Sequence, residues 1–153
     1  QDLGMGNVHQ HTQSLASYLA HALASLRHAN GSPVCALYGR HRHPHAQWVQ
    51  GPIVAFNVLT AEGAFVKPTT VSNHLNNANI QVRDGVLCNP GSCMTSVGIS
   101  EASVVQRDYL DGCGWDDLIE GKPLGAVRAS VGYFNTWAEV DKVYQVLQAA
   151  FQR

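Results

Sequence analysis

Apolar residues recur three or four positions apart between residues 8 and 28. This spacing predicts an amphipathic helix with one apolar stripe. Asn7 is expected to cap the helix, because an Asn side chain accepts hydrogen bonds from the unpaired backbone N–H groups of the first turn. The sequence NGSP at 30–33 predicts its end, since Gly and Pro interrupt helices.

Four further helices follow from similar patterns. Pro68 suits the first turn of a helix that runs to about Asn77. Thr136 and Glu139 fit a capping box, in which a hydroxyl and a carboxylate each accept a hydrogen bond from backbone N–H groups at the start of a helix. The remaining two helices are expected to start near Ser92 and to cover about 100–110.

Short apolar runs between these helices predict strands. The run 53–59 is continuously apolar apart from Asn57, so it is expected in the centre of a sheet. Residues 61–63 predict a hairpin turn. Other strands are expected over 34–38, 64–66, 80–83 and 126–131. Such a mixture of helices and hairpins indicates an α/β two-layer sandwich, in which helices pack on a small, largely antiparallel sheet, and 1–153 is expected to be a single domain.

Composition and charge argue against several functional classes of protein. The chain is 45% hydrophobic and 14% charged, with a net charge of −1, which argues against binding to nucleic acid or an anionic membrane. No apolar run approaches the roughly 20 residues that span a bilayer, and the polar start does not resemble a signal peptide. A cytoplasmic location is therefore expected, and Gln1 in place of Met indicates a processed piece or an expressed fragment.

The chain has four cysteines, Cys35, Cys88, Cys93 and Cys113. Their density is low and the chain is long enough to fold without disulfides, so we expect reduced thiols. Cys88 and Cys93 are nevertheless close enough in sequence to oxidise in an isolated fragment.

Histidines alternate at His9 and His11 and again within the loop 40–45. Imidazoles with this spacing could take up zinc or nickel. A structural metal site normally needs four ligands, and no Cys lies beside these histidines. We therefore predict no metal site and interpret the second group as a solvated loop.

The segment 82–93 reads VRDGVLCNPGSC and places Cys88 in a loop rich in Gly and Pro. A guanidinium at Arg83 and a helix start near Ser92 would both favour the thiolate, which is the nucleophilic form of a cysteine. A mobile loop would also let a cysteine accept sulfur in one position and release it in another. A structural cysteine beside a turn is the alternative.

The segment 125–136 reads GAVRASVGYFNT and places Arg128 inside an apolar strand. A buried guanidinium requires an acceptor, and an Arg fork suits a substrate carboxylate. The alternative is a salt bridge to Asp116, Asp117 or Glu120.

Together the two segments resemble the small domain of cysteine desulfurases, which are pyridoxal-phosphate enzymes of the class V aminotransferase type. The matching patterns are Arg-x-Gly-x-x-Cys, here from Arg83 to Cys88, and Arg-Ala-Ser from Arg128, followed by Phe-Asn-Thr. Four further motifs resemble the molybdenum cofactor sulfurase branch: GPIVAFNVL at 51–59, CNPGSC at 88–93, VGIS at 97–100 and IEGKPLGAVR at 119–128.

This resemblance implies a sulfurtransferase with L-cysteine desulfurase activity. Cys88 would attack the sulfur of L-cysteine and become a persulfide, and Arg128 and Arg83 would bind the substrate carboxylate. The sulfur would then pass to the molybdenum cofactor of xanthine dehydrogenase and aldehyde oxidase. The pyridoxal-phosphate lysine belongs to a large domain that this chain lacks, so the chain alone is expected to be inactive. Its uncovered surface would favour self-association, such as a homodimer.

Two departures from the family pattern bear on these roles. Val86 stands where many members carry another cysteine, which supports Cys88 as the acceptor. Asp84 stands where a small residue is usual and could compete for Arg83. Two alternatives stay open: a cysteine desulfurase that serves other sulfur acceptors, and a non-catalytic sulfur carrier or interaction module.

Overall fold

The computed structural model describes residues 3–86, 90–111 and 117–153. The helices are α1 (Met5–Ser25), α2 (Ala46–Val49), α3 (Pro68–Asn77), α4 (Pro90–Val97), α5 (Glu101–Asp111) and α6 (Trp137–Phe151), and the strands are β1 (Cys35–Tyr38), β2 (Ile53–Val58), β3 (Leu118–Ile119), β4 (Lys122–Pro123) and β5 (Val127–Ser130). No helix in these ranges combines the length and apolar character needed to cross a membrane.

The main sheet is antiparallel, with the strand order β1-β2-β5. The run 53–59 forms its central strand, as its apolar character predicts. β5 joins the sheet from far along the chain, where Phe56 of β2 lies opposite Val127. The α/β two-layer architecture with an antiparallel sheet is confirmed.

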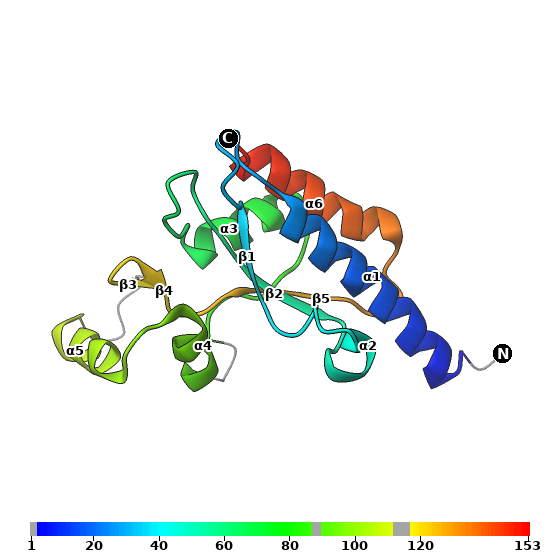
Figure 1. Ribbon diagram of the computed structural model, residues 1–153, viewed down its shortest axis with the longest axis horizontal. Coiled ribbons are helices and arrows are strands. Elements are labelled where there is room, and N and C mark those ends of the chain that lie inside the picture. The colour runs from blue at the N-terminus through cyan, green and yellow to red at the C-terminus, as the bar shows by residue number, and fades with distance from the viewer. Residues whose placement is uncertain (1–2, 87–89, 112–116) are drawn as a thin grey trace.

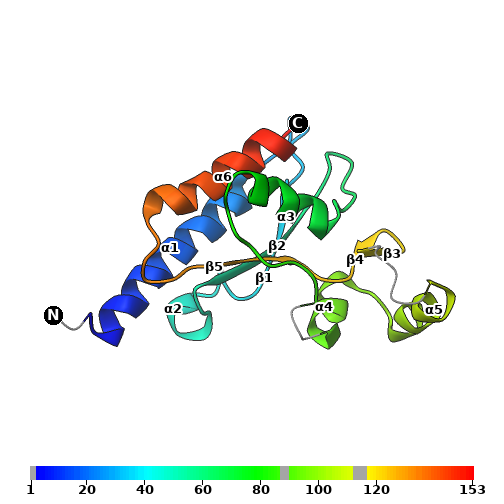
Figure 2. The same ribbon diagram turned by 180° about the vertical axis from the view of Figure 1, so that it is seen from behind.

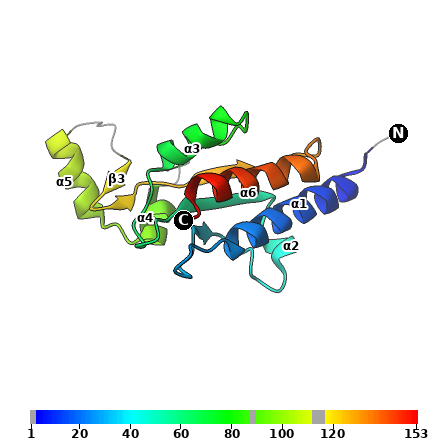
Figure 3. The ribbon, with the colours of Figure 1, turned by 90° about the horizontal axis from the view of Figure 1, so that it is seen from above.

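Helices α1, α3 and α6 cover one face of this sheet, as Figures 1 and 2 show. Seen from above, α1 and α6 lie side by side along the sheet (Figure 3). Leu15, Leu19 and Leu23 on α1 pack with Val54 and Phe56 of β2 in one core of buried apolar residues. Helix α4 lies on the opposite side of the sheet, whereas α2 lies against α1, where Gln13 Nε2 donates to Ala46 O and Gln50 O.

The helix predicted over 8–28 is present as α1, but it begins earlier, at Met5, and ends earlier, at Ser25, and its N-cap residue is Gly4 and not Asn7. The Asn7 prediction is wrong: its side-chain Nδ2 donates a hydrogen bond to Leu3 O (3.0 Å). By contrast, α3 has the predicted bounds. The capping box of α6 is also confirmed, because the Thr136 side chain accepts from Glu139 N while the Glu139 carboxylate accepts from Thr136 N.

The strand predicted over 80–83 is wrong, since Arg83 is the only described residue of this segment that pairs, in an isolated bridge. Asn79 has a positive φ of 59° and Ile80 N donates to Leu75 O, so the chain stays tied to the end of α3. A cavity of about 450 Å³ then separates Ile80 and Val82 from the edge of β5. The turn at 61–63 is confirmed by hydrogen bonds between Thr60 and Ala64, although 64–66 adds a bridge and not a full strand.

Candidate functional site

The two motif segments lie side by side in the structure. Arg83 and Arg128 form an antiparallel bridge, in which Arg128 N donates to Arg83 O (2.7 Å) and Arg83 N donates to Arg128 O (3.2 Å). Two residues away from this bridge in each segment, Ala126 N donates to Gly85 O (3.1 Å). Residues 83–85 and 126–128 therefore form a short two-stranded stem. The chain between these two segments contains α4, α5 and the β3–β4 hairpin (Figure 1). We call 86–125 the excursion.

The register of the strands places both arginines on the sheet face opposite α1, α3 and α6. Tyr38 lies opposite Ala55, Ala55 opposite Arg128, and Arg128 opposite Arg83. Directly opposed residues of antiparallel strands point to the same face. The result is a row of four side chains across the sheet, in which the small side chain of Ala55 separates Tyr38 from Arg128.

The arginine pair has no carboxylate partner in the described part of the chain. Arg128 is half-buried and Arg83 is exposed, and Arg128 Nε is buried without a hydrogen-bond partner among those residues. The carboxylate of Asp117, which the sequence offered as an alternative, accepts a hydrogen bond from Thr69 N (2.9 Å). The salt bridge from Arg128 to Asp117 or Glu120 is therefore absent within these ranges, and Asp116 lies outside them.

A close approach of two glycines completes the stem. Gly125 has a φ of 140°, and a Cβ at this position would lie 2.7 Å from Gly85 Cα and still closer to the Gly85 carbonyl group. Real side chains do not tolerate such contacts, and a residue with a Cβ also disfavours this φ. Gly85 itself has a φ of 101°. Glycine at 125 allows this close approach, and glycine at 85 allows its positive φ.

Asn57 is a part of this site that the sequence did not identify. Its side chain is fully buried, and its Nδ2 donates to Gly125 O (2.9 Å) and to the Tyr38 hydroxyl oxygen (3.0 Å). A lone polar residue in an otherwise apolar strand was the available signal, because buried amides require hydrogen-bond partners.

Cys88, the predicted sulfur acceptor, lies outside the described residues, as does Cys113. What the structure describes is the chain on both sides of Cys88. Gly85 is held in the stem before it, and α4 begins at Pro90 after it. Helix α4 thus starts two residues earlier than predicted, which brings its positive N-terminal end closer to Cys88 along the chain.

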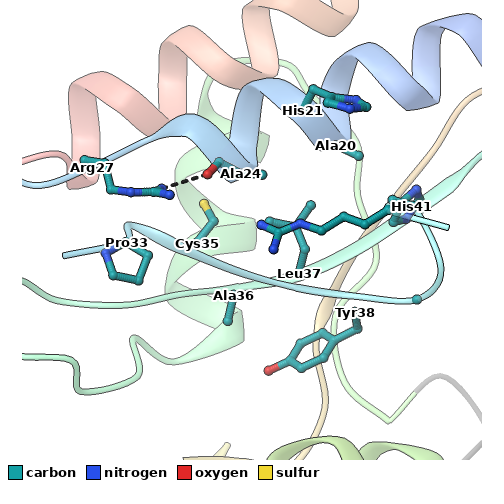
Figure 4. Close-up of a pocket in the computed structure, with 12 residues that line it drawn as sticks. Ala20, His21, Ala24, Arg27, Pro33, Cys35, Ala36, Leu37, Tyr38 and His41 are labelled. Atoms are coloured by element: carbon teal, nitrogen blue, oxygen red, sulfur yellow. Dashed lines mark hydrogen bonds between the residues drawn. The ribbon is translucent and has the colours of Figure 1, made fainter. Parts of the chain in front are cut away.

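Cys35 provides a contrast, because it is a free thiol in the core. It borders a cavity of about 460 Å³ between α1 and β1. In Figure 4 the Cys35 sulfur points toward α1 near Ala24, whereas Ala36 and Tyr38 point to the opposite side of β1. Burial raises the pKa of Cys35 to about 12, so this thiol stays protonated at neutral pH and is a poor nucleophile.

Two of the three lysines, Lys122 and Lys142, are engaged away from the two arginines. Lys122 Nζ donates to Gly98 O (2.6 Å) and Lys142 Nζ donates to Ala78 O (2.7 Å). Both amines are engaged by backbone carbonyls on separate parts of the surface, and neither lies in the row that holds the two arginines. Lys122 and Lys142 therefore do not fit the cofactor, although the arginine pair fits a carboxylate.

The alternating histidines make separate contacts with different partners. His9 stacks on Trp48, His11 Nε2 donates to Asn135 O (2.9 Å), and the His43 ring accepts from His45 N. Among the residues described, no three His, Cys, Asp or Glu side chains are arranged to hold a metal ion.

No protein-family model matches the chain. A molybdenum cofactor sulfurase from Bos taurus is 43% identical over 137 residues, which cover 87% of this chain and 15% of that protein. The Homo sapiens protein of the same name is 41% identical over 140 residues, covering 90% of this chain and 16% of that protein. The chain thus spans less than a fifth of the length of these relatives.

Solved structures show the same fold. A cysteine desulfurase from Thermococcus onnurineus NA1 aligns with a TM-score of 0.64 at 22% identity, over 96% of this chain and 26% of that one. A cysteine desulfurase from Escherichia coli aligns with a TM-score of 0.58 at 17% identity, over 97% of this chain and 26% of that one.

Proposed function

The chain is homologous, over about 90% of its length, to one segment of the molybdenum cofactor sulfurases, and we propose that it is the sulfur-accepting small domain of such an enzyme. The observation that carries the proposal is the pairing of Arg83 with Arg128 at the base of the segment that bears Cys88. Two guanidinium groups without a carboxylate partner in the described structure suit an anionic substrate. L-cysteine carries such a carboxylate.

In this proposal Cys88 is the nucleophile. Its thiolate attacks the sulfur of L-cysteine, an S–S bond forms, the C–S bond breaks, and the carbon takes up a proton so that alanine leaves. The arginine side chains bind the carboxylate, with Arg128 the principal contact because its guanidinium is half-buried. The N-terminal end of α4 and Arg83 both favour the thiolate form of Cys88.

The remaining parts of the reaction belong to the parent protein. Pyridoxal phosphate would be held by a large domain outside this chain, since Lys122 and Lys142 do not fit it. The persulfide sulfur would pass to the molybdenum cofactor of xanthine dehydrogenase and aldehyde oxidase. The isolated chain would then produce no alanine from L-cysteine.

Replacement of Cys88 tests this function. We expect Cys88→Ala in the parent protein to abolish both the persulfide formed from L-cysteine and the activation of xanthine dehydrogenase. Cys35→Ala is the matched control and should keep both, because the Cys35 thiol is buried and protonated. Persulfide is measured by mass spectrometry of the cysteine peptides.

The outcomes separate the alternatives. Full activation with Cys88→Ala contradicts the assignment. Persulfide on Cys88 without activation of xanthine dehydrogenase instead favours a desulfurase that serves other acceptors. A Cys88 that accepts sulfur only from another protein's persulfide favours a carrier module.

A further inference from the structure

We propose that Asn57 is a positioning residue, which holds the segment leading to Cys88 through the peptide group between Gly125 and Ala126. This inference rests on the proposed role of Cys88. Asn57 is the one polar residue of β2, and its side chain is fully buried. Burial of an amide is unfavourable unless its groups are hydrogen-bonded. An Asn at this position therefore supplies donors that an apolar side chain of the same size lacks.

A chain of hydrogen bonds leads from Asn57 to the stem. Asn57 Nδ2 donates to Gly125 O (2.9 Å), and Ala126 N donates to Gly85 O (3.1 Å). The acceptor Gly125 O and the donor Ala126 N belong to one peptide group, so the two bonds share that group and polarise each other. The orientation of this single peptide determines where Gly85 rests, three residues before Cys88.

Because Gly125 and Gly85 lie so close together, the position of Gly85 depends on the orientation of the 125–126 peptide. Gly125 approaches Gly85 more closely than any side chain would allow. Rotation of the 125–126 peptide therefore has to displace Gly85 or break its bond to Ala126. The Arg83–Arg128 bridge, two residues earlier, is the other described contact of this arm with β5. Loss of the Asn57 donor should leave that bridge and the arginines in place while the Cys88 end of the arm shifts.

A purely structural role of Asn57 is the competing explanation, and the chain offers a matched control for it. Gln13 is also a buried amide, and its Nε2 donates to two acceptors, Ala46 O (3.2 Å) and Gln50 O (2.7 Å). Its Oε1, like Asn57 Oδ1, is buried without a partner among the described residues. Gln13 thus has the same chemistry, but it bonds to α2 and not to the stem.

The experiment compares Asn57→Leu and Asn57→Asp with Gln13→Leu and Gln13→Glu in the full-length parent protein. Leu and Asp are close in size to Asn, and neither donates to Gly125 O when the Asp is ionised. The single-turnover rate of persulfide formation on Cys88 and the KM for L-cysteine are measured. We expect both Asn57 variants to lower the rate by about 10- to 100-fold, because a misplacement of about 1 Å in a reacting group can cost about 100-fold. The KM should stay within about threefold, because the arginines keep their positions, and both Gln13 variants should keep the wild-type rate within the same factor.

Equal rates for the Asn57 and Gln13 variants, or a loss confined to KM, would overturn the proposal. Hydrogen exchange of wild-type protein gives a second readout that requires no variant. The Ala126 amide should exchange as slowly as the Arg128 amide, which donates to Arg83 O. Fast exchange of the Ala126 amide hydrogen would contradict the proposal, even if none of the variants folds. If wild-type Cys88 accepts no sulfur while Ala126 is protected, the proposed function fails and the hydrogen-bonded chain stands.

Discussion

The two faces of the three-stranded sheet differ in what they carry and in what covers them. On the face under α1, α3 and α6, Val54, Phe56 and Val127 are fully buried in the core. On the opposite face, Ala55 and Arg128 lie in the row with Tyr38 and Arg83. Alternate residues of the same strands thus separate the buried core from the proposed substrate-binding row, because successive side chains of a strand point to opposite faces. Substitutions on the two faces should therefore affect different properties.

The largest effect on stability is expected from a substitution on the helix-covered face. We predict that Phe56→Ala lowers the free energy of unfolding by about 3–5 kcal/mol, since it removes a large side chain from a closed core. Urea unfolding measures this change. Ile53→Ala is the control on the same strand, because Ile53 points to the other face and is 39% exposed. An equally large loss for Ile53→Ala would show that the two faces do not divide stability in this way.

The next effect concerns the arginine row. Arg128→Lys in the parent protein should raise the KM for L-cysteine by about 10- to 100-fold, because Lys cannot make the paired hydrogen bonds that Arg makes to a carboxylate. The free energy of unfolding should change little. Steady-state kinetics of alanine formation test the prediction, with Arg42→Lys on the exposed loop after β1 as the control. An unchanged KM would remove Arg128 from the substrate site.

The smallest effect lies at the start of α6. Hydrogen bonds from the Thr136 backbone and side chain hold the pKa of Glu139 below its usual value. The folded state therefore favours the ionised carboxylate, and the stability it adds is present above pH 4.5 and lost as the pH falls through the lowered pKa. Wild type should exceed Glu139→Gln in thermal stability at pH 7 and match it in strong acid. A difference that is constant with pH would contradict this account, and sulfur transfer should be unchanged because α6 is on the helix-covered side.

Sequence reasoning succeeded where a local signal determines the structure. Pro68 and the Thr136–Glu139 capping box act within one turn of their own helices, and both helices begin where these residues predict. The apolar run of β2 likewise placed it at the centre of the sheet. The Asn7 cap failed because the helix begins at Met5, so that Asn7 lies inside its first turn.

The remaining features depend on contacts between distant segments. The β3–β4 hairpin has two residues in each strand, which is too few for an alternating pattern to predict it. The segment 80–83 has an apolar pattern typical of a strand, but its tie to α3 limits pairing to Arg83. For the proposed site, the motifs predicted both arginines by resemblance, whereas the proposed role of Asn57 depends on Gly125, 68 residues away.

The stem has a consequence for how the length of this chain can vary. Residues 83–85 and 126–128 close the base of the excursion, so its ends stay together whatever lies between them. The entropy lost on closing a loop grows only with the logarithm of its length, and a doubling adds about 0.6 kcal/mol. Insertions beyond α4 should thus be tolerated without movement of the arginines, whereas one added residue within the stem would turn Arg128 to the other face of the sheet.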